Sequence, residues 1–260
     1  MQCVVCNAEM KYSFTETVLG KYKVSYFHCL DCGFLRTEEP YWLDEAYNRA
    51  ISAADTGLLQ RNLVIAAKLA AILYFCFDAE GSFVDVAGGY GALTRLMRDI
   101  GFDFYWEDRY CENLLAIGFE SDKSGPSIRA LTAFEVLEHV PDPLDFLSSL
   151  MLRFRTRNVI FSTETYRGPS PPDSQWWYYA FRTGQHVAFY RKETLQKIAQ
   201  RLNLNFFSAR GIYALSERVL PNRLLLAMLS GKLAFPLAAY IRWRLGSRTM
   251  SDHSKLLRIL

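Results

Sequence analysis

The chain has 260 residues, of which half are hydrophobic and 22% are charged. This balance excludes a globally disordered chain and allows one full-sized domain with small additions, or two modest domains. The formal net charge of +3 comes from 30 basic and 27 acidic residues, and so small an excess does not by itself indicate a nucleic-acid-binding protein.

The chain shows no signal for membrane insertion or export. It holds no run of 18 uninterrupted apolar residues, so no transmembrane helix is predicted. Its first residues lack a charged segment followed by an apolar one, so no signal peptide is predicted. We therefore expect a cytoplasmic protein.

Four cysteines near the N-terminus have the spacing of metal ligands. Cys3 and Cys6 are two residues apart, as are Cys29 and Cys32, and 22 residues lie between the pairs. Two such pairs are the ligand set of a zinc ribbon, with the segment 11–27 as a short hairpin between them. A disulfide framework is the alternative, which a cytoplasmic chain disfavours. We predict a zinc ribbon over residues 1–40, with a structural zinc ion because four thiolates leave no open position.

The rest of the chain alternates between helices and strands. Residues 41–78 read as a helical connection, and residues 217–260 as a basic, apolar, helical tail. Between them, residues 79–216 hold predicted strands at 82–86, 102–107, 117–120, 128–134, 158–162, 206–208 and 211–215. Helices are predicted at 92–99, 111–116, 143–152 and 191–202. This order predicts an α/β fold with a doubly wound, mostly parallel, seven-stranded sheet of the Rossmann-like type.

A glycine-rich turn follows the first of these strands. Val84-Asp85-Val86 runs into Ala87-Gly88-Gly89-Tyr90-Gly91, and Asp108 stands 17 residues later at the end of the second strand. Glycine lets a ligand approach the backbone, and a carboxylate at this place can accept both hydroxyls of a ribose. The combination predicts a cofactor that contains adenosine. From these residues alone, a nicotinamide dinucleotide and S-adenosylmethionine both remain candidates.

Three segments of the chain resemble motifs of one enzyme family, and the most specific of them follows the fourth strand. The segment 85–91, Asp-Val-Ala-Gly-Gly-Tyr-Gly, resembles the D-V-G-x-G-x-G motif of class I S-adenosylmethionine-dependent methyltransferases, with Ala87 in place of the first glycine. The segment 135–143, Glu-Val-Leu-Glu-His-Val-Pro-Asp-Pro, is similar to their E-V-L-E-H-V-x-D-P segment after strand four. The segment 184–195 looks like the family's element before the last helix. With the ribbon, the chain most resembles small bacterial methyltransferases that modify sugars, polysaccharide precursors and natural products.

The resemblance implies roles for particular residues. It implies that the segment Asp85 to Gly91, with Ala87 and Gly89, borders the methionine and ribose parts of S-adenosylmethionine. It implies that Asp108 takes the ribose hydroxyls, and that Phe134 and Glu135 lie beside the sulfonium.

Methyl transfer to a hydroxyl also requires a group that accepts a proton. His139, after strand four, and His186, in the later loop, are the candidates, and each could instead cap a turn. Glu138 lies beside His139, and some relatives use an E-x-x-E-H segment with a distant histidine to hold a divalent cation. A Mg²⁺ ion on Glu135, Glu138, His139 and His186 is therefore a further option, although the same letters occur in relatives without metal.

Two segments remain open in their role. The aromatic segment 176–181 could stack on an acceptor or pack as a lid on the core. The tail from Val219 has seven basic residues and one acidic residue, so it could dock on an anionic membrane. We favour packing on the sheet or on a second subunit, as in a homodimer, and nucleic acid is disfavoured because the ribbon is not basic. The competing function is a non-catalytic cofactor- or partner-binding module.

Overall fold

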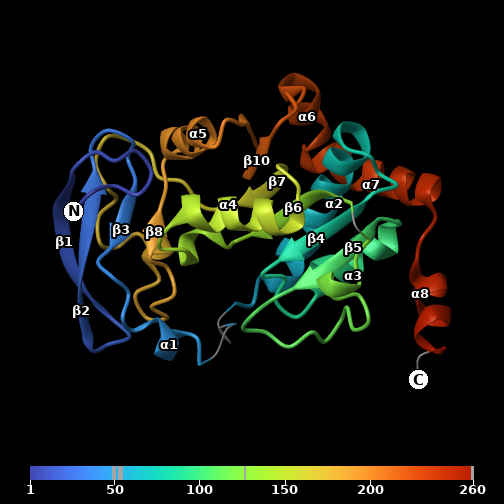
Figure 1. The fold of residues 1–260 in the computed structure, drawn as a ribbon, viewed down its shortest axis with the longest axis horizontal. Helices are drawn as coiled ribbons and strands as arrows, with labels where there is room; N and C mark the ends of the chain where they lie inside the picture. The colour runs from blue at the N-terminus through green and yellow to red at the C-terminus, as the bar shows by residue number, and fades with distance from the viewer. Residues whose placement is uncertain (49–50, 52–54, 126, 259–260) are drawn as a thin grey trace.

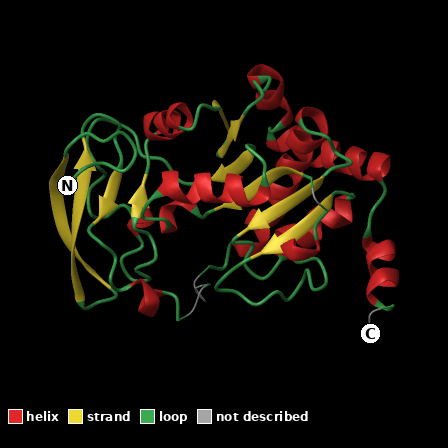
Figure 2. Ribbon diagram, viewed as in Figure 1, coloured by secondary structure: helices red, strands yellow, loops and turns green. Residues whose placement is uncertain are grey.

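The computed structural model describes residues 1–48, 51, 55–125 and 127–258. Two β-sheets lie beside each other, and helices cover the larger one (Figures 1 and 2). The strands are β1 (Met10–Val18), β2 (Tyr22–Cys29), β3 (Leu35–Thr37), β4 (Ser82–Val86), β5 (Asp103–Glu107), β6 (Ile128–Phe134), β7 (Val159–Ser162), β8 (Ala188–Phe189), β9 (Asn205–Ala209) and β10 (Ile212–Ser216). The α-helices are α1 (Leu43–Ala46), α2 (Leu58–Cys76), α3 (Ala92–Ile100), α4 (Pro143–Phe154), α5 (Lys192–Arg201), α6 (Asn222–Met228), α7 (Gly231–Leu245) and α8 (Thr249–Leu256).

The larger sheet has the strand order β5-β4-β6-β7-β10-β9. Strands β5, β4, β6 and β7 are parallel, and β10 runs antiparallel to both of its neighbours. The predicted α/β fold is confirmed, with four parallel strands, but within the described residues the sheet is mixed and has six strands rather than the seven predicted. In the segment 117–120 only Glu120 bridges to Trp106. Gly118, with φ of +87°, turns the backbone before a strand can form.

Side chains of the larger sheet alternate between two apolar layers. Val84 and Leu131 belong to the layer of α4 and α5, whereas Phe83 and Ala130 belong to the layer of α2, α3, α6 and α7. This alternation follows from the two-residue period of a strand. The functional loops at the carboxyl ends of β4, β5 and β6 therefore project from a sheet that is buried on both faces.

Local signals placed most helices correctly. Helix α4 begins after Asp142, as predicted, and its side chain accepts hydrogen bonds from the backbone N–H groups of Leu144 (3.1 Å) and Asp145 (3.0 Å). The predicted helix at 111–116 was wrong, since that segment forms turns and bends. The predicted helical connection is divided into α1 and α2, and its residues 49–50 and 52–54 lie outside the described residues.

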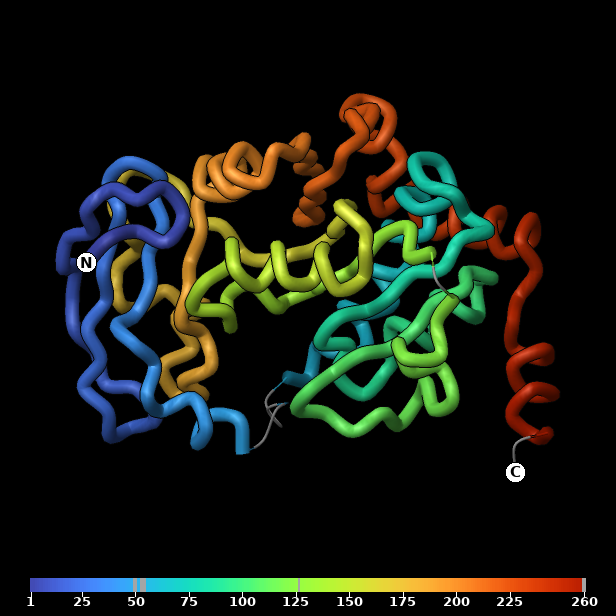
Figure 3. Tube along the Cα trace, in the orientation of Figure 1, coloured from blue at the N-terminus to red at the C-terminus, as the bar shows by residue number. Residues whose placement is uncertain are grey.

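The smaller sheet joins the N-terminal segment to the α/β core. Its order is β1-β2-β3-β8, with antiparallel pairing throughout, so the last strand comes from residues far along the chain. Figure 3 shows the orange segment that contains β8 beside the blue N-terminal strands. Side chains reinforce this junction, because Thr194 donates to the carbonyl of Cys32 (2.7 Å) and the Trp42 indole donates to that of Gly184 (2.8 Å). The N-terminal segment is thus anchored on the core.

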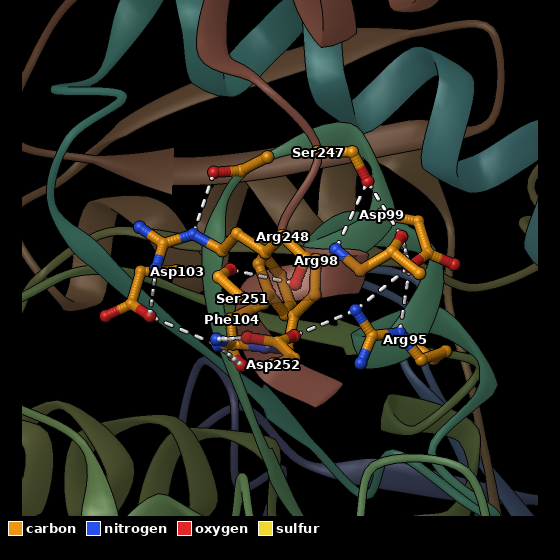
Figure 4. A network of polar contacts seen from close by, with 11 residues as sticks. Arg95, Arg98, Asp99, Asp103, Phe104, Ser247, Arg248, Ser251 and Asp252 are labelled. Atoms are coloured by element: carbon orange, nitrogen blue, oxygen red, sulfur yellow. Dashed lines mark hydrogen bonds and ion pairs between the residues drawn. The ribbon is translucent and has the colours of Figure 1, made fainter. Parts of the chain in front are cut away.

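The C-terminal helix is held to the core by buried charges (Figure 4). Asp252 of α8 receives two hydrogen bonds of 2.8 Å from the guanidinium of Arg98 on α3, and one of 2.9 Å from Arg95. Arg98 also bonds Asp103 of β5, and so does Arg248 just before α8. Burial acts to raise the pKa of Asp252, but the hydrogen bonds and positive charges of Arg98 and Arg95 together lower it.

Helix α2 is long and apolar enough to cross a membrane by length and composition alone. Within the described residues, α6 and α7 meet the same measure only as a pair, across a bend of 90°. Helix α2 nevertheless packs as a core helix, because its central residues from Ile65 to Leu73 are largely buried against the sheet and α7.

Candidate functional site

The glycine loop follows β4 and begins with backbone in the left-handed region. Ala87, Gly89 and Gly91 have φ values of +53°, +55° and +85°. Gly91 precedes α3, and a Cβ atom there would lie 2.9 Å from the amide oxygen of Asn113. Ala87 thus adopts the conformation that favours glycine, which a non-glycine residue adopts at a cost of roughly 1–2 kcal/mol.

Asp85 supports this loop from below. Its side chain is buried, and its carboxylate accepts a hydrogen bond of 2.6 Å from the Thr132 hydroxyl on β6. Burial raises the pKa of Asp85 to about 7. The carboxylate therefore lies under the loop, where it ties β4 to β6.

Asp108 lies directly beside the glycine loop. One carboxylate oxygen accepts from the backbone N–H of Gly89 (2.9 Å), and the other accepts from those of Tyr110 (2.7 Å) and Cys111 (2.9 Å). The side chain is only partly buried, so lone pairs remain open to a ligand above the loop. The glycine loop and Asp108 thus lie side by side, as predicted, and the open lone pairs of the Asp108 carboxylate could accept a ribose hydroxyl.

The end of β6 provides a second strained position. Phe134 is the last residue of β6 and pairs with Ser162 of β7, while Glu135 follows with φ of +55°. The Glu135 N–H donates to the Ser162 hydroxyl (3.1 Å), and that hydroxyl donates to the Glu135 carboxylate. Strained residues persist where the surroundings determine them, and they cluster at functional sites.

Glu138, His139 and His186 form one cluster beyond this strand. Their ligand atoms all lie within 4.8 Å of one another, and the two imidazole rings meet edge to face at 4.8 Å between centroids. Each ring places Nδ1 at a backbone carbonyl, His139 at that of Gln185 (3.2 Å) and His186 at that of Tyr178 (2.7 Å). With Nδ1–H donating to these carbonyls, Nε2 of each ring is the atom that can accept a proton or bind a metal.

Burial sets the charge state of this cluster. It lowers the pKa of His139 to about 3 and that of His186 to about 4, so both rings are neutral near pH 7. It raises the pKa of Glu138 to about 8, with the nearby Glu135 as a lesser cause. The hydroxyls of Tyr178 and Thr163 face Glu138 and act to lower its pKa, but neither carboxylate oxygen has a partner at hydrogen-bond geometry. Glu138, His139 and His186 thus offer one carboxyl group and two neutral imidazoles, which are ligand types that a divalent cation can bind.

The smaller sheet positions His186. The residue that follows it, Val187, donates its N–H to the carbonyl of Glu138 (2.8 Å), and its carbonyl accepts from the N–H of Thr37 (3.0 Å). Strand β3 thus holds Val187, and Val187 in turn bonds Glu138, so these backbone bonds bring His186 and His139 together although they lie 47 positions apart in sequence.

Two tyrosines near the site, Tyr47 and Tyr110, were not predicted from the sequence. Tyr47 stacks on Tyr110 with 4.5 Å between ring centroids, and its ring lies 6.2 Å from that of His139. Tyr47 therefore links the Asp108 loop to the histidine cluster. Tyr110 could have been identified by its position two residues after Asp108, whereas nothing in the helical-looking segment 41–78 distinguished Tyr47.

The aromatic segment 176–181 mostly packs on the core. Tyr178 and Tyr179 are 2% and 1% exposed and join an apolar cluster with the smaller sheet, whereas Trp177 is 74% exposed. The two tyrosines therefore pack on the core and are not free to stack on an acceptor. Tyr178 also lies against His186, with 4.6 Å between ring centroids.

The four N-terminal cysteines converge as their spacing predicted. The Sγ atoms of Cys3 and Cys32 are 3.6 Å apart and those of Cys6 and Cys29 are 3.4 Å apart, and all four lie within 4.8 Å of one another. The structure joins none of the four in a disulfide. Four sulfurs at about 2.3 Å from a tetrahedral zinc ion would be separated by roughly 3.8 Å, so the cluster fits zinc. Backbone N–H groups of Val5 and Cys6 also point at the Cys3 sulfur, as in a metal knuckle.

Comparisons with solved structures return proteins of similar fold at low identity. TnmH is 20% identical with a TM-score of 0.47, over 67% of this chain and 60% of TnmH. CalO1, a methyltransferase in calicheamicin biosynthesis in its SAH-bound form, is 13% identical with a TM-score of 0.45, over 69% of this chain and 60% of CalO1. Magnesium protoporphyrin IX methyltransferase from Synechocystis PCC 6803, with bound SAM, is 14% identical with a TM-score of 0.37, over 68% of this chain and 92% of that one. The chain thus spans about three fifths of the first two proteins.

Family assignment comes from sequence. No curated protein matches the chain significantly. The family model described as a methyltransferase domain matches residues 59–209, which include β4 to β9 and the site residues from Asp85 to His186, but not Tyr47 or the four N-terminal cysteines. Because this match spans more than half of the chain, the protein belongs to the methyltransferase-domain family.

Proposed function

We propose that this methyltransferase transfers a methyl group to a hydroxyl of a small molecule or of a sugar or polysaccharide precursor. The observation that carries the proposal is the cluster of Glu138 and His139, which follow β6, with His186, which precedes β8; β6 pairs with β4, the strand that leads into the glycine loop. When S-adenosylmethionine is bound, it supplies the reactive methyl group. The acceptor oxygen must then form a bond to that carbon as the carbon–sulfur bond breaks, and the acceptor must lose its proton.

The chain's own residues divide this task. Asp108 and the amides around Gly89 would hold the ribose, and Glu135 would lie at the methionine side. His186 or His139 would accept the proton of the acceptor through Nε2. Exclusion of water would come from Tyr47 and the surrounding aromatic residues.

A divalent cation bound to the same cluster explains loss of the acceptor's proton better than a histidine base does. A general base works best when its pKa is near the operating pH, and imidazoles of pKa about 3 and 4 are poor bases. A cation on Glu138, His139 and His186 would instead acidify the bound hydroxyl. Mg²⁺ prefers oxygen ligands, so two imidazoles favour a transition metal such as Mn²⁺ or Fe²⁺ over the Mg²⁺ that the sequence suggested.

The test is an acceptor screen that measures S-adenosylhomocysteine formation, beginning with nucleotide sugars and small phenols. With an active acceptor, His186→Asn should lower kcat by about 10²–10⁴-fold with little change in cofactor affinity. His253→Asn, in the exposed part of α8, is the matched control and should keep full activity. Loss of activity on chelation that returns with Mn²⁺ supports the cation, whereas indifference to chelator supports histidine alone.

The competing reading is a binding module without turnover. It would be favoured if the protein bound S-adenosylhomocysteine tightly while no acceptor class supported product formation. It would be rejected by any acceptor whose methylation depends on His186.

We also propose that Cys3, Cys6, Cys29 and Cys32 bind one structural zinc ion. The sulfur separations and the backbone N–H groups around Cys3 support it. Metal analysis of the purified protein should return one equivalent of zinc, and Cys29→Ser should lose the metal and unfold at lower temperature. Less than half an equivalent, together with normal folding of the serine variant, would refute the proposal. Cys111→Ser is the matched control because Cys111 lies outside the cluster.

A further inference from the structure

Helix α7 has two apolar faces, and only one of them packs against the rest of the described structure. Its inner face packs on α2 and the neighbouring helices through Ala234, Leu237, Ala238, Ile241 and Leu245. Its outer face, defined here as Leu233, Pro236, Tyr240 and Trp243, follows spacings of three, four and three residues and is exposed. Leu233 and Tyr240 are each 46% exposed and Trp243 is 74% exposed. This outer face has no partner within the described residues.

The flanks of the outer face are basic. Lys232, Arg242 and Arg244 are exposed on α7, and none of the three has a carboxylate partner among the described ion pairs. The stretch 219–251 contains five basic residues and no acidic residue. Helix α6 continues the surface, with Leu224 and Leu226 54% and 45% exposed and Arg223 beside them. Figure 1 shows α6 and α7 together at the outer edge of the molecule.

We propose that the outer face of α7 docks on an anionic lipid surface. A helix with an apolar stripe, a tryptophan and basic flanks has the composition of an interfacial helix that lies in the plane of the headgroups. The first 218 residues carry a net charge of 3 − 6 = −3, where +3 is the charge of the chain and +6 that of residues 219–260. The body is therefore repelled by anionic lipid while the tail is attracted, which fixes the orientation of docking.

Charge also decides against a second copy as the occupant. A two-fold dimer places the same patch on both subunits, so it would bring two basic, carboxylate-free faces together. Like charges across an interface oppose association. A nucleic acid would meet the basic flanks, but the apolar stripe between them would remain unsatisfied.

The test is co-sedimentation of the full chain with vesicles. One set contains phosphatidylcholine with phosphatidylglycerol, and the other contains phosphatidylcholine alone. We expect binding to the anionic vesicles, weaker binding in high salt, and much weaker binding to neutral vesicles.

Two variants with matched controls locate the contact. Lys232→Gln/Arg242→Gln should lower the partition coefficient about 30-fold, because each basic residue near an anionic surface contributes about fivefold. The control Lys11→Gln/Lys23→Gln changes the net charge equally on the exposed hairpin of β1 and β2, and it should have no effect. Trp243→Ala should lower binding at least about tenfold. Trp177→Ala is its control, since both indoles are 74% exposed.

Several outcomes would overturn the proposal. These are the absence of sedimentation, equal binding to both vesicle types, or control variants as damaging as the α7 variants. A dimer in sedimentation velocity that Trp243→Ala dissociates would assign the face to a second copy. A mobility shift with duplex DNA or RNA that the Lys232/Arg242 variant abolishes, without vesicle binding, would assign it to nucleic acid. Unchanged thermal unfolding of each variant shows that the fold is intact.

Discussion

Replacement of Asp108 by asparagine tests the cofactor site most directly. In the structure one carboxylate oxygen accepts from Gly89 and the other from Tyr110 and Cys111. Asparagine keeps the shape and can keep the two bonds at the second oxygen. Its NH₂ group, however, would face the N–H of Gly89, so that a donor meets a donor.

The size of the effect follows from these contacts. The variant loses the negative charge that a ribose hydroxyl would donate to, and hydrogen bonds to charged groups contribute about 1.5–3 kcal/mol each. We therefore expect S-adenosylhomocysteine to bind roughly 10- to 150-fold more weakly. The loop amide of Gly89 also loses its acceptor, so the free protein should unfold at a slightly lower temperature.

Isothermal titration with S-adenosylhomocysteine measures the loss. Asp145→Asn is the control, because Asp145 is exposed on α4 and lies outside the site. If Asp108→Asn binds S-adenosylhomocysteine as tightly as the wild type does, the carboxylate only organises the loop amides and the ribose assignment is wrong.

Three further predictions concern the stability of the fold, each measured by urea unfolding. Ala87→Gly should raise the free energy of unfolding by about 0.5–1 kcal/mol, because relief of left-handed strain exceeds the entropy cost of glycine, and a loss of stability would contradict this. Asp85 has its pKa raised to about 7 by burial, so its stabilising effect is full below its ordinary pKa of 3.8 and is lost as pH rises through about 7. The free energy of unfolding of Asp85→Asn should therefore be closer to that of the wild type at about pH 8 than at about pH 5. An equal difference between the two proteins at both pH values would refute the raised pKa. Asp252→Ala should lower the free energy of unfolding by about 3 kcal/mol, because the buried Arg98 loses two of its hydrogen bonds and keeps only those to Asp103 and the Phe104 carbonyl. A smaller loss with faster hydrogen exchange confined to α8 would show that α8 detaches. Wild-type stability without such exchange would refute the role of Asp252 in holding α8.

The elements with strong local signals were predictable from sequence. The N-cap at Asp142, the strand 128–134 and the turn after Val86 depend on residues that are neighbours in the chain, and all three are in the structure. The segment 111–116 has helical residue types but forms turns, because Asp108 accepts the N–H of Cys111 and Asn113 accepts that of Ala116. Local side-chain acceptors of this kind compete with helix formation.

The site was predictable in its residues but not in its assembly. Spacing identified the four cysteines, the glycine loop with Asp108, and the two histidines. It did not indicate that β8 pairs with β3, or that Val187 thereby joins His186 to Glu138. It also did not indicate Tyr47, which follows α1 and stacks on Tyr110, 63 residues later in the chain. Such contacts depend on tertiary packing, which no local pattern encodes.

The pairing of β3 with β8 has a consequence for synthesis of the chain on the ribosome. Thr194 bonds Cys32 across 162 residues of sequence, so the smaller sheet can be completed only after most of the chain has been made. At ordinary rates of translation that interval is on the order of 10–30 s. Throughout it, the outer edge of β3 carries unpaired backbone groups, which are a template for pairing with another nascent chain. The first strands to be made are therefore the most exposed to aggregation until β8 arrives, and a slower synthesis of the core would prolong that exposure.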